Sequence, residues 1–229
     1  RTHAVPRLVR TPDLRIAYFS PLAPQKSGIS DYSEELLPRL KEYADIDIFV
    51  DGYRPLNEAI YDQFHVYDYR AYRDLAERKP YDINVYQMGN SAFHEYIYNQ
   101  LLKYPGVVVL HDFSLHGLIY HMTLARGNKL AYLAEVEYCE GKAARREVER
   151  GLKEGRLDFY TYPLNRRVVA AGEGVIAHSQ WILDELALRG ASLPMAKVHQ
   201  GVHVRPPDPK HRAKIRAQLG LSDGQFVIG

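Results

Sequence analysis

The chain has 229 residues, of which 46% are hydrophobic and 25% are charged, and its formal net charge at pH 7 is only +2. This composition is typical of a folded globular protein, and the interleaving of acidic and basic residues argues against a nucleic-acid-binding surface. The single cysteine excludes an intrachain disulfide and a cysteine-based zinc site, so we expect a protein of a reducing compartment, the cytoplasm.

Apolar runs alternate with patterns of helical spacing along the chain. The short apolar runs predict β-strands over residues 14–19, 46–50, 81–86, 107–110, 174–177 and 196–198. Between them, apolar residues recur at helical spacing in residues 32–43, 93–101 and 182–186. Such repeated β-α units predict an α/β fold, a three-layer sandwich with helices on both faces of a mostly parallel sheet. From residue 114 to about 155 the pattern is helical, which predicts an insertion after the strand that ends at Leu110.

A long polar loop follows the first predicted strand. Its candidate ligand-binding residues are Lys26, Ser27 and Gly28. Asp31, with Glu34 three residues later, marks the expected start of the next helix. A helix N-terminus offers unpaired N–H groups and the positive end of the helix dipole, which favour a phosphate or a sugar hydroxyl. A plain solvated loop explains the same residues equally well.

Polar residues also follow the strand predicted over residues 81–86. The amides of Gln87 and Asn90 are suited to hydrogen-bond a hydroxylated ligand, and Gly89 permits a close approach to the backbone. Ordinary turn chemistry is the alternative explanation for the glycine and the asparagine.

The strand over residues 107–110 runs directly into His111 and Asp112. Ligands of open α/β sheets bind outside the carboxyl ends of the strands, so these two residues are the foremost site candidates. The alternative is that Asp112 caps the next helix. Two further histidines, His116 and His121, lie five residues apart and therefore cannot share one helix face as metal ligands. We expect no metal site there, and we expect both rings at polar positions of the helix.

The C-terminal part repeats the pattern of strand, cap and helix. Ser179 follows the strand over residues 174–177 and is explained as the N-cap of a helix that stops at Gly190. A proline-rich connector at 205–209 then indicates a domain boundary. We therefore predict one domain over residues 1–205. Residues 206–229 would hold a linker and the start of a second domain, with a helix over 210–219 and a strand over 226–229.

Together these motifs resemble the N-terminal half of retaining glycosyltransferases of family 4, which have the GT-B architecture of two Rossmann-like domains. The most specific segments are residues 24–32, residues 109–112, residues 174–179, the Gly201-Val202 turn and residues 219–229. The first loop departs from the family pattern because it lacks adjacent glycines. The resemblance spans nearly the whole chain and implies a Rossmann-like, acceptor-side domain.

The resemblance implies transfer of a sugar from a nucleotide-diphosphate sugar to a sugar or lipid-linked acceptor, with retention of configuration. A C-terminal domain of the same protein would bind the nucleotide sugar, so the fragment alone would be nearly inactive. The nucleotide sugar is a substrate, and neither a cofactor nor a metal is expected in the chemical step. His111 would be the catalytic residue, hydrogen-bonded to donor sugar or acceptor. The implied substrate-binding residues are Lys26, Ser27, Gly28, Gln87, Asn90, Asp112 and Ser179.

Three alternatives accompany this interpretation. The same sheet edge would serve a sugar- or nucleotide-binding module without chemistry, and a metal-dependent hydrolase would use His111, Asp112 and His116. Basic residues between 126 and 156 would also suit a peripheral contact with anionic lipid. Glutamates lie among them, so a solvated, ion-paired helix surface is the favoured explanation of that segment.

Overall fold

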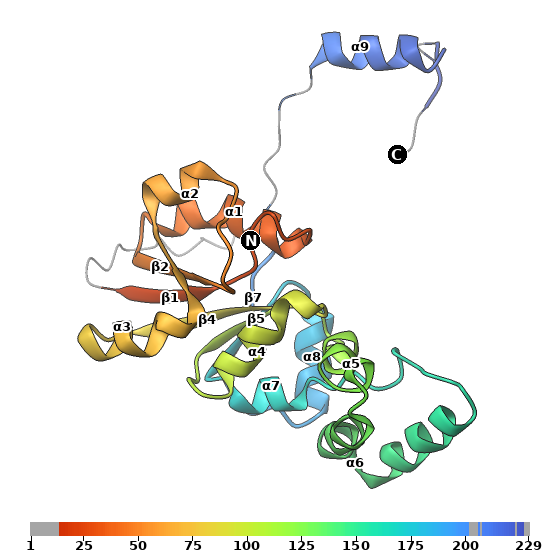
Figure 1. The fold of residues 1–229 in the computed structure, drawn as a ribbon. Helices are drawn as coiled ribbons and strands as arrows, with labels where there is room; N and C mark the ends of the chain where they lie inside the picture. The colour runs from red at the N-terminus through yellow and green to blue at the C-terminus, as the bar shows by residue number, and fades with distance from the viewer. Residues whose placement is uncertain (1–13, 202–205, 207, 223, 227–229) are drawn as a thin grey trace, which may run out of the picture.

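One parallel β-sheet forms the centre of the molecule (Figure 1). The computed structural model describes residues 14–201, 206, 208–222 and 224–226. The seven strands of this part lie in the order β3-β2-β1-β4-β5-β6-β7, and every neighbouring pair is parallel. They are β1 Arg15–Phe19, β2 Asp45–Val50, β3 His65–Asp68, β4 Ile83–Met88, β5 Val107–Leu110, β6 Gly174–Ala177 and β7 Met195–Lys197. The predicted α/β, Rossmann-like fold is confirmed.

Helices cover both faces of the sheet because strand side chains alternate between the faces. Tyr18 packs on one face with Leu37 of α1 and Ile60 of α2. Its neighbour Phe19 packs on the opposite face, in the larger cluster that includes Ile97 of α4. The α-helices are α1 Gly28–Leu40, α2 Glu58–Gln63, α3 Tyr72–Arg78, α4 Glu95–Leu101, α5 His116–Met122, α6 Lys129–Lys153, α7 Arg166–Ala171, α8 Gln180–Leu188 and α9 Pro209–Gln218.

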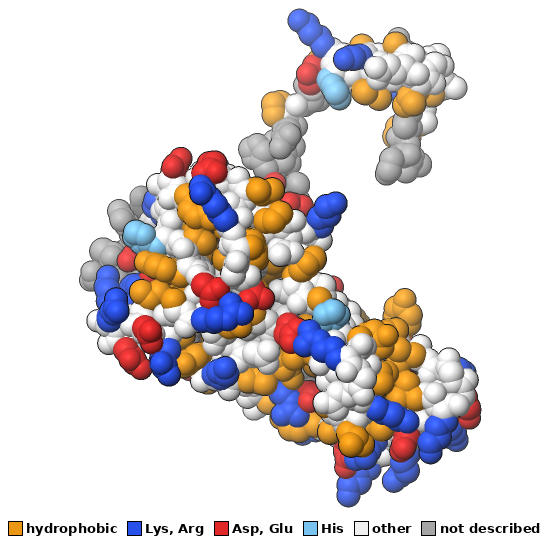
Figure 2. All heavy atoms as spheres, viewed as in Figure 1, with side chains coloured by type: hydrophobic (Ala, Val, Ile, Leu, Met, Phe, Trp, Pro, Cys, Tyr) orange, Lys and Arg blue, Asp and Glu red, His pale blue; other side chains and the backbone are white. Residues whose placement is uncertain are grey.

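The predicted helical insertion is formed by α5 and α6, which follow β5 in the chain (Figure 1). Gly141 interrupts α6 with a φ of 90°, a conformation that glycine adopts readily. Acidic and basic side chains are interspersed on the face shown in Figure 2. Ion pairs of this segment are Glu137–Arg145, Glu149–Lys153 and Glu154–Arg156. These pairs favour the solvated, ion-paired surface over the lipid contact.

Two strands differ from the sequence prediction. The pattern missed β3, because its four residues begin with His65 and end with Asp68 and so form no apolar run. Strand β4 lies two residues later than the predicted 81–86, so Gln87 belongs to the strand instead of following it. As part of the strand, Gln87 has a buried side chain on one face of the sheet, with an exposure of only 1%.

The predicted boundary near residue 205 falls largely outside the described residues, as does most of the strand expected over 226–229. Helix α9 occupies the predicted position, and none of its residues is buried. The division into two domains therefore stays a prediction.

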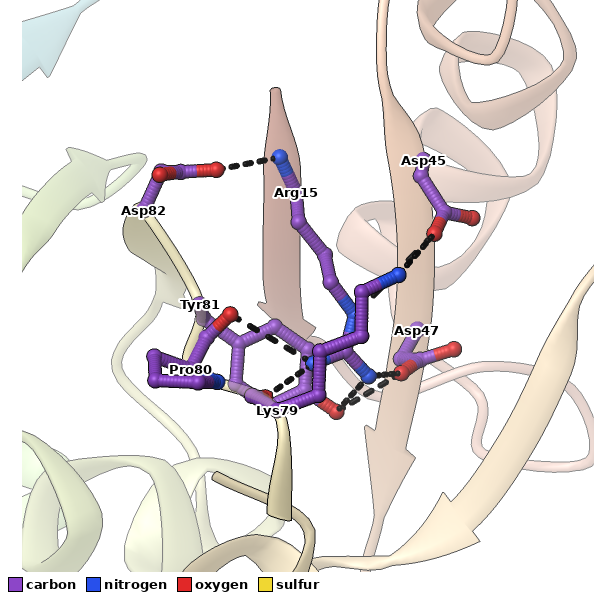
Figure 3. A network of polar contacts seen from close by, with 7 residues as sticks. All are labelled: Arg15, Asp45, Asp47, Lys79, Pro80, Tyr81 and Asp82. Atoms are coloured by element: carbon purple, nitrogen blue, oxygen red, sulfur yellow. Dashed lines mark hydrogen bonds and ion pairs between the residues drawn. The ribbon is translucent and has the colours of Figure 1, made fainter. Parts of the chain in front are cut away.

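A polar network joins β1, β2 and the start of β4 at the amino ends of these strands (Figure 3). The Arg15 guanidinium donates to Asp47 Oδ2 at 2.6 Å, and the Tyr81 hydroxyl donates to the same oxygen at 2.7 Å. The Arg15 guanidinium also lies 4.0 Å from the centre of the Tyr81 ring. Since ligands of such sheets bind at the opposite edge, we assign the network a structural role.

Candidate functional site

The candidate site lies where β4, β5 and β6 end. The register pairs Gln87 with Val109, and Leu110 with Ala177. The residues that directly follow β5 and β6 are His111 and His178. Because side chains alternate along a strand, Gln87, His111 and His178 all point to the face that α1 covers. The amide of Gln87 and the imidazoles of His111 and His178 therefore lie close together at the carboxyl ends of three neighbouring strands.

His111 is held by its backbone and by its ring. Its backbone N–H donates to Met88 O at 3.0 Å, which extends the sheet pairing by one residue. Its ring Nε2–H donates to Gln87 Oε1, and the two atoms are 2.7 Å apart. With the proton on Nε2, the other ring nitrogen, Nδ1, is a hydrogen-bond acceptor. Gln87 thus orients the imidazole, and its contact with a substrate stays a prediction.

His178 and Tyr32 complete the cluster, and neither was predicted from the sequence. The ring centroids of His111 and His178 are 4.9 Å apart, and the Tyr32 ring of α1 lies 4.9 Å from the first and 5.2 Å from the second. His178 Nδ1–H donates to Val198 O at 2.8 Å, whereas its Nε2 is buried without a partner among the described residues. The signal that would have found His178 is its position directly after β6, which matches that of His111 after β5.

Burial keeps His111 neutral. It lowers the pKa of the imidazole to about 3, and the neighbouring His178 and His94 lower it further in the same direction. Near neutral pH the ring therefore carries no positive charge with which to pair a phosphate. It is suited to accept a hydrogen bond from a hydroxyl group through Nδ1.

A second buried histidine, His94, lies beneath this edge of the sheet. Its exposure is 1%, and its Nε2 has no partner among the described residues. Its Nδ1 lies 3.0 Å from the Ser91 hydroxyl. Burial lowers the pKa of His94 to about 4. The ring packs against Gly89, where a Cβ atom would lie 2.9 Å from His94 Cε1 and would also clash with Ile29 of α1.

Gly89→Ala is expected to destabilise the domain by about 1–3 kcal/mol, because the added methyl group forces His94 or α1 to shift in a packed interior. Urea unfolding of the purified chain measures the loss. Gly28→Ala is the matched control, since a Cβ atom at Gly28 would meet nothing within 4 Å. Equal stability of the two variants would contradict the assigned packing.

Three predicted substrate-binding residues have structural partners. Asp112 Oδ2 accepts from the Asn90 backbone N–H at 2.8 Å, and Asn90 Oδ1 accepts from the Leu118 N–H in the first turns of α5 at 3.0 Å. Ser179 is the N-cap of α8, as its pattern indicated, and accepts from Ile182 N–H at 3.3 Å. These bonds explain the residue types without a ligand, and the substrate contacts of all three stay predictions.

The first loop leads directly into α1, which begins three residues before the predicted start at Asp31. Ser27 is the actual N-cap, because its hydroxyl accepts from the Ile29 N–H at 3.2 Å. Glu34 forms no capping box and instead accepts from Ala23 N–H at 2.9 Å. Lys26 and Gly28 are exposed, which agrees with either the predicted diphosphate contact or a solvated loop.

The three histidines weighed as metal ligands do not form a group. His116 is buried in the core, where its Nδ1 lies 2.8 Å from Tyr162 O and its Nε2 lies 2.6 Å from the Tyr132 hydroxyl. Both ring nitrogens of His116 thus have hydrogen-bond partners within the domain. The residue is buried and does not occupy the polar surface position that the pattern suggested. Within the part of the chain that the structure describes, no three histidine, cysteine or acidic side chains lie together as a metal site.

Two sizeable cavities lie away from the cluster of His111, His178 and Tyr32. One of about 580 Å³ is lined by residues of α6, α7 and α8, among them Gly141, Asn165 and Arg189. The other, of about 560 Å³, lies at the amino ends of β2 and β3, beside Asp45 and His65. Neither contains a predicted site residue, so the carboxyl edge of the sheet stays the candidate site.

Comparison with protein-family models and with curated proteins found no match to the chain. The structure itself defines an α/β domain with a seven-stranded, all-parallel sheet and a helical insertion. No helix among the described residues is long and apolar enough to cross a membrane.

Proposed function

We propose that the chain is the acceptor-side half of a retaining glycosyltransferase, which moves a sugar from a nucleotide-diphosphate sugar to an acceptor hydroxyl. The observation that carries the proposal is the neutral His111, oriented by Gln87 and flanked by His178 and Tyr32 at the carboxyl edge of a parallel sheet. The motif resemblance supports it independently. A second domain of the same protein would supply the nucleotide pocket.

In this proposal His111 acts by hydrogen bonding and not as a nucleophile. Its Nδ1 accepts from a hydroxyl of the sugar or the acceptor, which holds the reacting oxygen near the anomeric carbon. The exposed N-terminus of α1, with Lys26, Ser27 and Gly28, approaches the departing diphosphate and stabilises its charge. No metal or cofactor takes part in these steps, and cytoplasmic location stays a prediction.

The test is transfer by the protein expressed from its complete native reading frame, assayed with a panel of nucleotide-diphosphate sugars. His111→Ala is expected to lower kcat/KM about 100-fold, because a positioned hydrogen bond in the transition state is lost. His65→Ala, an exposed histidine of β3, is the matched control and should keep the wild-type rate.

An undiminished rate in the His111→Ala enzyme would refute the role of this histidine. A reading frame without a second α/β domain would refute the transferase proposal and favour the sugar- or nucleotide-binding module. Sugar affinity would then be the quantity to measure in place of turnover.

A further inference from the structure

His178 lies both in the candidate site and at the point where the chain leaves the sheet. Strand β7 is an edge strand, and the described residues that follow it are exposed. The Val198 N–H donates to Ala177 O at 3.0 Å, and the Val198 carbonyl accepts from His178 Nδ1–H at 2.8 Å. Within the described part of the chain, no hydrogen bond joins residues 199–201 to the sheet. Val198 is therefore the last residue of this exit segment, residues 198–201, that is fastened to the sheet.

The imidazole that holds Val198 also packs inside the candidate site. Its centroid lies 4.9 Å from that of His111 and 5.2 Å from that of Tyr32. The bond to the Val198 carbonyl requires the proton on Nδ1, so Nε2 is the unprotonated nitrogen. The ring cannot turn over without losing this bond. The position of the exit segment and the orientation of the His178 ring therefore depend on each other.

Packing alone does not account for a histidine at this position. Its Nε2 is buried without a partner among the described residues, which costs free energy that an apolar side chain would avoid. Val198 is 47% exposed, so water can reach this edge of the sheet and its carbonyl does not need a side-chain donor. The bond between His178 and Val198 thus joins two groups that the stability of the fold does not require to be joined.

We propose that His178 is a positioning residue that couples the exit segment to the orientation of His111. When the exit segment shifts, the Val198 carbonyl moves, and the His178 ring follows it or loses its bond. Either change alters the packing of His178 against His111. The coupling is reciprocal, because a ligand held by His111 restrains the exit segment by the same free energy.

This inference goes beyond the proposed function, and only its consequence for catalysis rests on that proposal. In a two-domain transferase the exit segment leads toward the second domain. Movement of that domain would then reach His111 through His178. The coupling itself is a property of the 229-residue chain and is measured there without a donor or an acceptor.

Two amide variants separate the two ring nitrogens. Asparagine places an N–H near the position of Nδ1 and can keep the bond to the Val198 carbonyl, whereas glutamine places its amide near Nε2. His178→Asn should keep the hydrogen-exchange rate of the Val198 N–H close to that of the wild type, as measured by NMR. His178→Gln should raise that rate about fivefold, the equivalent of one net hydrogen bond. The Val175 N–H, which donates to Pro194 O at the other end of β7, is the internal reference.

The coupling is tested from the exit side with all three rings intact. Val198→Pro removes the N–H that bonds to Ala177 O and so loosens the last attachment of the segment. The nitrogen chemical shifts of the His111 ring should move in this variant. Lys197→Pro is the matched control, because alternate N–H groups of an edge strand point away from the neighbouring strand and this proline removes no bond to β6. It should leave the His111 shifts unchanged.

The catalytic consequence is measured in the enzyme expressed from its complete native reading frame. His178→Gln should lower kcat/KM about tenfold, mainly through kcat, because His111 loses its orientation and not its own contacts. His178→Asn should restore most of the rate. A purely structural role would affect both variants alike.

Three results would overturn the proposal. Unchanged His111 shifts in Val198→Pro would remove the coupling. Equal exchange rates in His178→Asn and His178→Gln would show that the Nδ1 bond does not hold the exit segment. Equal kcat/KM values of these two variants in an active enzyme would refute the positioning role. An enzyme without transfer activity would instead refute the proposed function, and the exchange rates and ring shifts would still decide the coupling.

Discussion

Asp47→Asn is expected to lower the free energy of unfolding by about 3–5 kcal/mol, the largest single-residue effect that we predict at the amino edge of the sheet. The Asp47 side chain is only 5% exposed, and that of its partner Arg15 is 12% exposed. Removing the negative charge takes from the guanidinium its one close carboxylate partner, in a place that water hardly reaches, and leaves only the longer contact with Asp45 at 4.0 Å. The Tyr81 hydroxyl, which donates to the same carboxylate, also loses its charged acceptor.

Asp45→Asn is the matched control, because Asp45 lies on the same strand and also faces Arg15, at 4.0 Å. Its side chain is 62% exposed, so water screens the pair and the expected loss is below about 1 kcal/mol. Urea unfolding of both variants at neutral pH gives the comparison. A similar loss in both would show that the Arg15–Asp47 pair is no more than a surface contact.

Much of the fold was predictable because buried parallel strands are continuous apolar runs. The run over residues 107–110 and the run over 174–177 coincide with β5 and β6. Strand β3 was missed because it lies at the sheet edge, where His65 and Asp68 need not be apolar. The start of α1 was misplaced because Ser27 and Asp31 both suit an N-cap, and only the three-dimensional structure shows which one accepts the backbone bond.

The candidate site was predictable only in part. His111 and Gln87 were found because both lie at strand ends, and the structure brings them into contact. His178 was overlooked because the adjacent Ser179 explained the segment as a helix cap. Tyr32 belongs to α1, and its contact with both histidines depends on how that helix crosses the sheet, which no local pattern encodes. Tertiary packing therefore decides which polar residues share the site.

Acidification from pH 6.5 to 4 is expected to destabilise the domain by about 3 kcal/mol for each of His94 and His111. Burial lowers the pKa of His94 to about 4 and that of His111 to about 3, below the value of about 6.5 in an unfolded chain. As the pH falls below 6.5, His94 and His111 bind protons in the unfolded chain, whereas both imidazoles stay neutral in the folded domain until the pH approaches their lowered pKa values. The contribution to stability is therefore complete above pH 6.5 and is lost as the pH falls toward the two lowered pKa values.

Urea unfolding at a series of pH values between 7 and 4 measures this slope, and the variants separate its sources. His94→Gln and His111→Gln should each reduce the slope by up to about 1.4 kcal/mol per pH unit, and the double variant should show the sum. Carboxylates titrate in the same range but are common to all four proteins, so the difference between the slopes belongs to the histidines. An unchanged slope in the double variant would mean that both rings take up protons in the folded domain. His111 would then carry a charge on acidification, and its assigned role as a neutral acceptor of a sugar hydroxyl would fail.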